Sequence, residues 1–287
     1  MNLLERLVLG VLVAVVIHSL VFRDGERPRR PAPEAFVPPR ETPSALPPSV
    51  PAPGLALPAP SAADPIFRVK IDARRGAATG SAFSVDREGV WLTARHVVQD
   101  CAQVGLRGSR GWVRAAVAWI HPRADLAMLR TESGTAALPR SPEPLTLGVD
   151  GFGMGFPQGK PGAVHGRLMG RSQMQAEGRF NGRAPTLSWA EVQRQPDFDG
   201  SLGGISGGPM LDRSGRLIGV VVAESPRRGR FETIAPEVLD TVSIDKRPLP
   251  RVAAGAGAIA VPAEAFGRAA DTLRSRLQIV QAVCTVK

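Results

Sequence analysis

The chain has 287 residues, of which 43% are hydrophobic, and this excludes a protein that is disordered throughout. Its net charge of +10 arises after residue 65, where 30 Lys and Arg stand against 20 Asp and Glu, while residues 1–65 carry six basic and six acidic residues. The arginines are scattered and no zinc-finger or aromatic-basic motif accompanies them, so we expect no nucleic-acid partner.

The N-terminal segment contains an apolar run. Residues 7–22 are apolar except His18 and Ser19, and as a helix they would cover about 24 Å, close to the thickness of a bilayer's hydrocarbon core. A cleaved signal peptide is the alternative, but the run is not followed by a good small-x-small cleavage site. We therefore predict an uncleaved single-pass transmembrane helix within residues 1–26, which makes the membrane a partner of this chain.

Proline dominates the next segment. Residues 27–65 contain 13 prolines among 39 residues, together with many Ala and Ser and almost no periodicity. Such a composition cannot pack a core and is typical of a solvated, extended spacer. We predict a disordered linker over 27–65.

From residue 66 the sequence changes to short strand-like runs that glycines interrupt. Many short strands separated by turn signals indicate an all-β domain over 66–287, either a sandwich or a pair of barrels. One helix is expected near the C-terminus, with Pro262 in its first turn and apolar residues at helical spacing up to Leu277. The expected strands are 66–73, 80–85, 90–93, 113–120, 126–130, 187–192, 217–222 and 256–261.

The most specific segment is Gly-Gly-Ile-Ser-Gly-Gly-Pro at residues 203–209. A nucleophilic serine needs an exposed hydroxyl on a tight turn, with backbone N–H groups beside it that can hold an oxyanion. Glycines on both sides permit the required dihedral angles and a close approach of substrate. A glycine-rich surface turn is the alternative interpretation, but the pattern makes Ser206 a candidate nucleophile.

A histidine and an aspartate complete a possible catalytic set. His96 follows an apolar strand that ends at Thr93, and its imidazole can accept a serine proton near neutral pH. Asp125 stands directly before another apolar run, an unusual place for an acid in a core. It is explained if its carboxylate accepts a hydrogen bond from His96 and fixes the tautomer of the imidazole.

The motifs Thr-Ala-Arg-His-Val, Asp-Leu-Ala-Met-Leu and Gly-Ile-Ser-Gly-Gly-Pro, in that order, resemble those of trypsin-like serine proteases. Within them, the glycine-rich segment 151–159 and the segment 255–262 resemble the bacterial HtrA/Deg group, so that the similarity covers residues 66–277. It implies a chymotrypsin-like fold of two six-stranded antiparallel β-barrels with a C-terminal helix. The active site would lie between the barrels.

The resemblance also implies roles for individual residues. Ser206 would be the nucleophile, His96 the general base and Asp125 the orienting carboxylate, with the backbone N–H groups of Gly204 and Ser206 as the oxyanion hole. The substrates would be polypeptides, and no cofactor or metal is expected, because the histidines and cysteines never approach ligand spacing. The predicted function is a serine endopeptidase.

Three features depart from the family pattern. Ile205 stands where the family usually has Asp or Asn, so activation by an ion pair between that acid and a freed N-terminus is not expected. Too few residues follow Pro262 for a PDZ domain, and Arg95 replaces an alanine common in relatives. Because of Ile205, the alternative function is a catalytically inactive, protease-like module that binds peptides. A phosphate-binding loop at 148–155 is disfavoured, since no Gly-Lys-Ser/Thr is present.

The two cysteines help to predict the cellular compartment in which the domain lies. Cys101 lies five residues after His96 and Cys284 lies near the C-terminus, so a disulfide between them would close a loop around most of the domain. Disulfides persist in oxidising compartments, which favours a domain on the periplasmic or extracellular side of the cell membrane. The arginines that follow the apolar run disagree, because the positive-inside rule would place them in the cytoplasm. Two free buried cysteines are the alternative to the disulfide.

Overall fold

The computed structural model describes residues 54–71, 76–249 and 258–286, all of which belong to one unit, Ala45–Lys287. The membrane helix expected within 1–26 and most of the expected linker lie outside the described residues. Among the helices that are described, none combines the length and apolarity needed to cross a bilayer.

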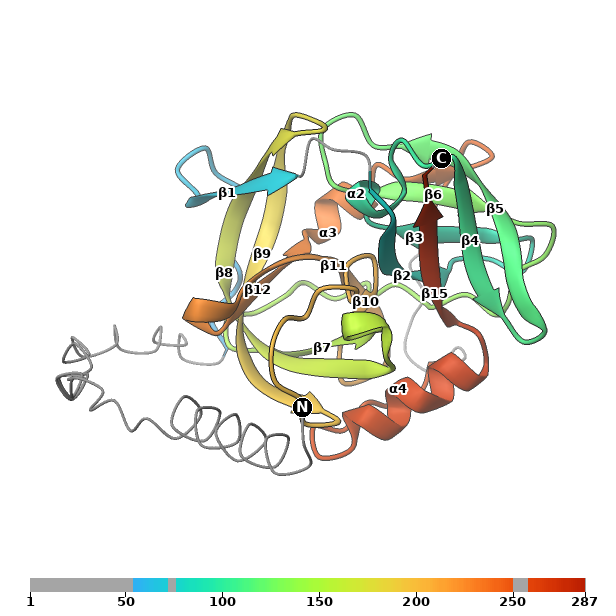
Figure 1. Cartoon of the computed structure of the whole chain (residues 1–287). Helices are drawn as coiled ribbons and strands as arrows, with labels where there is room; N and C mark the ends of the chain where they lie inside the picture. The colour runs from blue at the N-terminus through green and yellow to red at the C-terminus, as the bar shows by residue number, and fades with distance from the viewer. Residues whose placement is uncertain (1–53, 72–75, 250–257, 287) are drawn as a thin grey trace, which may run out of the picture. The chain divides into compact units, whose positions relative to one another are not determined.

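The N-terminal half of the domain and the last strand of the chain form a closed barrel of six strands in the order β15-β2-β3-β6-β5-β4, with every pair antiparallel (Figure 1). Side chains alternate across its wall: in β4, Val104 and Leu106 are buried while Gln103 and Arg107 are exposed. The first expected barrel is therefore present. Its strands are β2 (Ala78–Ser84), β3 (Val90–Thr93), β4 (Gln103–Gly108), β5 (Gly111–Ile120), β6 (Ala127–Arg130) and β15 (Ile279–Thr285).

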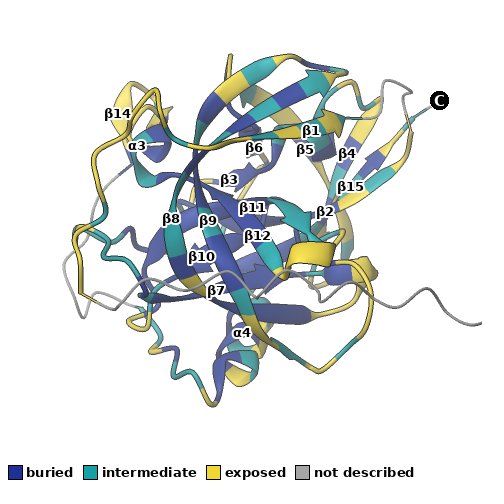
Figure 2. Cartoon of the chain, turned by 90° about the vertical axis from the view of Figure 1, so that its left-hand side faces the viewer, coloured by how far each residue is buried: buried dark blue, intermediate teal, exposed yellow. Residues whose placement is uncertain are grey.

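The second half is a seven-stranded sheet in the order β1-β8-β7-β10-β11-β12-β9, in which β9 pairs additionally with β8. Its apolar side chains, including Trp189 and Phe231, form a second buried cluster, and the buried strands of both sheets are dark in Figure 2. The strands are β1 (Ile66–Ile71), β7 (Asp150–Gly155), β8 (Gly162–Gly178), β9 (Gly182–Gln195), β10 (Pro209–Leu211), β11 (Leu217–Ser225) and β12 (Arg230–Ile234).

Strand β1 differs from the expected antiparallel arrangement, because it pairs with β8 in parallel, from Ile66 opposite Gln173 to Ile71 opposite Gly178. The preceding segment explains the direction. Leu57 donates a backbone hydrogen bond to Leu145 at 3.0 Å, and the chain then runs along β8 in the direction of that strand. A strand that runs beside β8 in this direction pairs with it in parallel.

The same contacts revise the end of the expected linker. Ala56 forms an antiparallel bridge with Thr146, and the carbonyl oxygens of Ser61 and Pro65 accept hydrogen bonds from the side chain and the backbone of Gln173, both at 2.8 Å. Residues 54–65 therefore lie against the domain, although a solvated linker was expected over them. Their backbone groups find partners on neighbouring loops and strands.

The C-terminal region also differs from the prediction. The expected strand at 256–261 is absent from its described part, residues 258–261, and helix α4 spans Phe266–Ser275, so it begins after Pro262 and not at it. The chain then turns at Leu277, whose φ is 56°, and re-enters the first barrel as β15. The helix is thus followed by a barrel strand that the sequence analysis did not predict.

Several short elements complete the domain, and one of them, α2, contains His96. Helix α2 (Arg95–Val98) follows β3, and helix α3 (Pro236–Leu239) follows β12. The others are the 3-10 turns η1 (Pro157–Gly159) and η2 (Pro226–Arg228) and the hairpin of β13 (Ser243–Ile244) and β14 (Arg247–Pro248).

A disulfide joins Cys101 to Cys284, with their Cα atoms 5.4 Å apart and a sequence separation of 183. Cys101 follows α2, and Cys284 lies in β15, where it is 1% exposed. The bond therefore ties the segment after His96 to the last strand of the barrel. The backbone N–H of Ala102 strengthens this junction by donating to Thr285 at 2.9 Å.

We predict that reducing this disulfide lowers the free energy of unfolding by about 3 to 5 kcal/mol, because a bond across so long a loop strongly restricts the unfolded chain. Urea denaturation with and without dithiothreitol measures the effect. A variant with C101S and C284S serves as the control and should unfold at one midpoint in both conditions. A wild-type midpoint that does not respond to dithiothreitol would contradict the prediction.

Candidate active site

Two of the predicted catalytic residues, His96 and Asp125, meet at one end of the first barrel. His96 lies in helix α2, directly after β3, and Asp125 lies in the turn before β6. Because β3 and β6 pair antiparallel, with Thr93 opposite Ala127, the end of one strand and the start of the other bring these two residues together. The sequence separation of 29 residues is closed by this pairing.

The carboxylate of Asp125 accepts two hydrogen bonds from His96. Its Oδ1 accepts from the backbone N–H at 2.8 Å, and its Oδ2 lies 2.6 Å from Nδ1 of the imidazole. The Asp125 side chain is 1% exposed and that of His96 is 23% exposed. With Nδ1–H donating to the carboxylate, the lone pair of Nε2 is free to accept a proton.

The protonation of His96 is set by opposing effects. Burial lowers the pKa of His96, but the charge of Asp125 and its hydrogen bond outweigh burial and hold the pKa above its usual value, while the charge of Arg179 opposes them. The buried Asp125 thus stabilises the imidazolium form. A base with this environment accepts a proton readily in the neutral range.

The turn that presents Asp125 is held by another histidine. Nδ1 of His121 accepts backbone hydrogen bonds from Arg123 at 3.1 Å and from Ala124 at 2.7 Å. Burial, followed by the charges of Arg123 and Arg95, lowers the pKa of His121, so the neutral imidazole that accepts these bonds is favoured.

The loop of residues 201–208 holds the candidate nucleophile, and most of its backbone N–H groups have acceptors. Ile205 donates to Leu202 at 2.9 Å, and Gly207 donates to Val221 at 2.8 Å. Gly208, Gly203 and Leu202 donate to Ile205, Ser201 and Glu224 respectively. Within the described residues, the N–H groups of Gly204 and Ser206 have no such acceptor, and the same holds for Ser201 at the start of the loop.

The orientation of the Gly204 N–H follows from its neighbour. The carbonyl oxygen of Gly203 accepts from the backbone N–H of Gln158 at 2.6 Å, and in a planar trans peptide the N–H of the next residue points to the opposite side. The N–H of Gly204 therefore points away from Gln158. Gly204 has a φ of +100°, a backbone conformation that residues with a side chain rarely adopt. In addition, a Cβ at this position would lie 2.5 Å from the carbonyl oxygen of Phe156.

Ser206 is brought next to the first barrel by backbone contacts. Its carbonyl oxygen accepts from the N–H of Ser81 in β2 at 2.8 Å. At Gly207, a Cβ would lie 2.2 Å from the carbonyl oxygen of Ser81 and 2.4 Å from Oγ1 of Thr93, so glycine alone allows this approach. The hydrogen bonds of the described residues do not include one between Ser206 Oγ and His96.

Ile205 anchors the loop by packing. It is 2% exposed and belongs to the second apolar cluster, together with Leu202, Met210 and Trp189. In place of an ion pair with a chain terminus, the loop is thus fixed by burial of an aliphatic side chain, which contributes about 2 kcal/mol.

The sequence analysis missed Ser81, which joins the loop to Phe156, the residue that follows β7. Its hydroxyl donates to the carbonyl oxygen of Gly204 at 2.8 Å and accepts from the N–H of Phe156 at 3.0 Å. Ser81 is fully buried within the strand β2. A single serine in an apolar strand carries no signal by itself, so this role could be found only from the structure.

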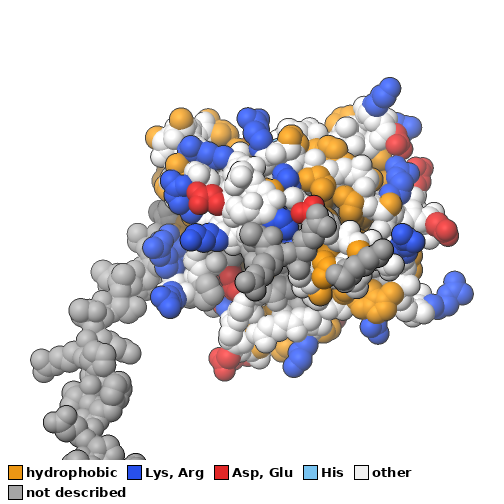
Figure 3. All heavy atoms as spheres, turned by 45° about the horizontal axis from the view of Figure 1, so that its top comes forward, with side chains coloured by type: hydrophobic (Ala, Val, Ile, Leu, Met, Phe, Trp, Pro, Cys, Tyr) orange, Lys and Arg blue, Asp and Glu red, His pale blue; other side chains and the backbone are white. Residues whose placement is uncertain are grey.

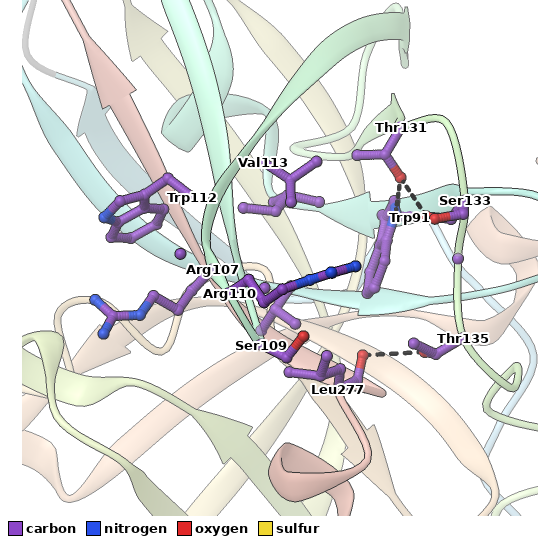
Figure 4. Close-up of a pocket in the computed structure, with 15 residues that line it drawn as sticks. Trp91, Arg107, Ser109, Arg110, Trp112, Val113, Thr131, Ser133, Thr135 and Leu277 are labelled. Carbon is purple, nitrogen blue, oxygen red and sulfur yellow. Dashed lines mark hydrogen bonds between the residues drawn. The ribbon is translucent and has the colours of Figure 1, made fainter.

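Other surface features of the described residues do not point to a ligand. On the face in Figure 3, basic side chains are spread around the periphery with acidic ones among them. No group of three or more His, Cys, Asp or Glu in the described ranges is placed to hold a metal ion. A cavity of about 360 Å³ lies at one end of β3 and β6, lined by Trp91, Arg110 and Thr131 among others (Figure 4). The pair of His96 and Asp125, here called the dyad, lies at the opposite end of these strands.

A buried acid lies within the second sheet. Glu232, which is 5% exposed, accepts hydrogen bonds from Ser188 at 2.8 and 2.9 Å and from Ser172 at 2.9 Å. Burial raises the pKa of Glu232 to about 7, against the opposing effects of these hydroxyls and of Arg230. The group belongs to the packing of β8, β9 and β12, and among the described residues no hydrogen bond or ion pair joins it to His96 or Asp125.

The part of the chain that contains this site is similar to known proteins. Residues 80–220, which include His96, Asp125 and Ser206, match the family model described as trypsin-like peptidase domain. The uncharacterized protein y4bJ of Sinorhizobium fredii (strain NBRC 101917 / NGR234) is 30% identical over 154 residues, which make up 52% of this chain and 23% of that protein. The match therefore spans less than a quarter of that relative's length.

Two solved structures are similar at low identity. The Rv3671c protease from M. tuberculosis in its active form has 17% identity and a TM-score of 0.47, covering 71% of this chain and 100% of that chain. The MamO protease domain from Magnetospirillum magneticum in its apo form has 20% identity and a TM-score of 0.41, covering 56% of this chain and 92% of that chain.

We predict that the buried acid makes stability fall as the pH rises from 5 to 8. The folded state holds a proton on Glu232 that the unfolded chain has already released, so stability is lost between the usual pKa of a glutamate and about 7. The loss should be on the order of 1 to 3 kcal/mol, and E232Q should remove it. Urea denaturation at pH 5, 6.5 and 8 measures it.

The exposed Glu143 offers a matched control, since E143Q also removes one carboxylate but should keep the wild-type pH dependence. If E232Q and wild type show the same pH dependence, Glu232 titrates normally and the prediction fails.

Proposed function

We propose that this chain, which carries a trypsin-like peptidase domain, is a serine endopeptidase that cleaves peptide bonds through an acyl-enzyme on Ser206. The observation that carries the proposal is the buried His96–Asp125 pair beside a loop whose Gly204 and Ser206 N–H groups have no acceptor in the described structure. Acyl transfer requires a nucleophilic serine, a general base and backbone N–H donors that can hold the oxyanion. The His96–Asp125 pair and the N–H groups of Gly204 and Ser206 would supply the last two.

The roles follow from the hydrogen-bond pattern. His96 Nε2 accepts the proton of the Ser206 hydroxyl as Oγ attacks the scissile carbonyl, and His96 then gives this proton to the leaving amine. A water molecule repeats the sequence and releases the acid product. Asp125 stabilises the imidazolium through the bond to Nδ1.

The oxyanion would be held by Gly204 and Ser206. The negative charge that develops on the carbonyl oxygen needs donors that are already oriented, and the bond from Gln158 to Gly203 orients the first of them. Packing of Ile205 in the second apolar cluster also stabilises this loop. This arrangement would be present without activation by cleavage.

The fold proposed with this function has two barrels. The pairings of β8, β7, β10, β11, β12 and β9 return to β8, and such a ring of pairings supports a second barrel. The active site would then lie between the two, with His96 and Asp125 from the first and Ser206 from the second. Strand β1 would lie outside this ring.

The alternative function is an inactive, peptide-binding module. Two observations favour it: the described hydrogen bonds do not link Ser206 Oγ to His96, and Ile205 departs from the family pattern. The first carries limited weight, because catalytic hydrogen bonds in free enzymes are often long and tighten only with substrate. The second is answered by the burial of Ile205, which supplies another way to fix the loop.

The disulfide supports a location for the catalytic domain. A bond between Cys101 and Cys284 persists in an oxidising compartment, which favours the periplasmic or extracellular side of the cell membrane. The helix expected within residues 1–26 would tether the domain there, and the polypeptide substrates would be met on that side.

Replacing the nucleophile tests the function directly. S206A in the full chain should lose covalent labelling by a fluorophosphonate probe and lower peptide hydrolysis by about a thousand-fold or more, because no other group can form the acyl-enzyme. S109A, at an exposed serine of the turn between β4 and β5, is the control and should label like wild type. Equal labelling of wild type and S206A would overturn the triad assignment, and no labelling of wild type would favour the binding module.

The pH dependence tests the base. Below its pKa, His96 carries a proton and cannot accept one from Ser206, so kcat/KM should fall on the acid side with an inflection above the usual pKa of histidine. The charge of Asp125 causes this displacement. A profile of kcat/KM from pH 5 to 9 measures it, and an inflection at or below the usual histidine value would show that Asp125 does not control the base.

A further inference from the structure

The hairpin of β8 and β9 extends from the second sheet to the catalytic pair. The two strands pair from Ala163 opposite Gln195 to Ala176 opposite Gly182, and the tip between them consists of Arg179, Phe180 and Asn181. Strand β1 pairs along the outer edge of β8 up to Gly178, which makes this part of the hairpin a three-stranded ribbon (Figure 1). A ribbon of three paired strands is stiffer than an isolated hairpin.

The tip binds the helix that carries His96. Nη2 of Arg179 donates to the carbonyl oxygen of His96 at 2.6 Å, and the side chain of Gln99 donates back to the carbonyl oxygen of Arg179 at 3.1 Å. These two bonds run in opposite directions between the same segments. They fix α2 against the hairpin at the residue whose imidazole must face Ser206.

A second contact explains Arg95. Its guanidinium carbon lies 4.1 Å from the centroid of the Phe180 ring, and Phe180 is 4% exposed. The same guanidinium donates through Nη1 to the carbonyl oxygens of His121 at 3.1 Å and Pro122 at 3.4 Å. Arg95 therefore connects the hairpin tip to the turn that leads to Asp125.

The hairpin also contacts this turn through its backbone. A Cβ on Gly182 would lie 2.2 Å from the carbonyl oxygen of Arg123, so glycine is required where the two chains meet. The hairpin thus touches both segments of the dyad: it contacts α2 through Arg179 and Phe180 of the tip, and the turn before Asp125 through Gly182 of β9. Contacts to both segments restrict their relative position.

From these contacts we propose that Arg179 is a positioning residue, which holds the backbone of His96 and, with Phe180 and Arg95, keeps the imidazole aligned with Asp125. The proposal rests on the proposed function, since it gives the hairpin of the second sheet a part in the same reaction. Arg179 does not touch the reacting atoms. It acts on the reaction through His96.

The energetics of Arg179 favour a role beyond packing. Its Nε is buried without a hydrogen-bond partner among the described residues, and leaving such a donor unpaired costs about 1 to 3 kcal/mol. An apolar side chain would avoid this cost. The guanidinium instead places a positive charge near the imidazole, where it opposes protonation of His96.

The charged groups around His96 can be separated by mutation. Asp125 faces the imidazole from the turn before β6 and raises the pKa of His96, and Arg179 faces it from the hairpin and lowers it. Arg95 lies on the same helix as His96, and Asp100 follows that helix. Removing the charge of Arg179 alone should therefore raise the pKa of His96.

The test measures this pKa by NMR titration of the His96 imidazole in full-length S206A, with and without R179Q. We expect R179Q to move the titration to higher pH. In chains that retain Ser206, R179Q should lower kcat/KM about ten-fold near pH 6.5 and less above pH 8, since one bond to a guanidinium and one charge are lost. A fall that is equal at every pH would show a structural role only and would overturn the proposal.

Two further variants sharpen the result. R179K keeps the charge and one donor, so it should titrate like wild type and recover part of the activity. R183Q removes an exposed arginine of the same hairpin that bonds to Gln173, and it should match wild type in both measurements. If R183Q moves the titration as far as R179Q does, the effect belongs to the charge of the hairpin in general and the proposal is wrong.

The NMR titration keeps the two proposals distinguishable, because it requires no catalytic activity. A wild type that fails to react with fluorophosphonate would end the proposed function, while a shift of the His96 titration in R179Q would still support the contact. An active wild type whose His96 titration ignores R179Q would leave the function standing and end the role of Arg179.

Discussion

The buried carboxylate of Asp125 is the constraint on which the site depends. It accepts from both the backbone N–H and the imidazole of His96, so it fixes the helix α2 and the tautomer of the ring together. Burying a charge is costly unless it is paired and hydrogen-bonded, and these bonds meet that requirement. The antiparallel pairing of β3 with β6, the turn held by His121 and the contacts of Arg95 all converge on keeping this carboxylate in place.

Close backbone approaches connect this pair to the serine loop. Gly207 lies against Ser81 and Thr93 with no room for a side chain, and Ser81 bonds to Gly204 on one side and Phe156 on the other. The glycines therefore serve two purposes: they allow the dihedral angles of the loop, and they let two sheets meet. Ile205 secures the loop from within the second core, which makes apolar packing the fixing interaction.

The sequence was informative where chemistry is local. The segments around His96, Asp125 and Ser206 each carry a recognisable pattern, and the strand and helix signals predicted an all-β domain with a C-terminal helix. The closed first barrel was implied by the resemblance to trypsin-like proteases. It was not informative where partners are distant. The strand β15, the parallel pairing of β1, the docking of residues 54–65 and the contact of Arg179 with His96 are set by tertiary pairing, and the residues involved show no local signal.

A crystal structure of the chain with a peptide aldehyde tests the central claim most directly. The account predicts a covalent bond from Ser206 Oγ to the aldehyde carbon, with the resulting oxygen within hydrogen-bond distance of the N–H groups of Gly204 and Ser206 and with His96 Nε2 beside Oγ. An aldehyde that binds without forming this bond, or an adduct whose oxygen points away from both N–H groups, would contradict it.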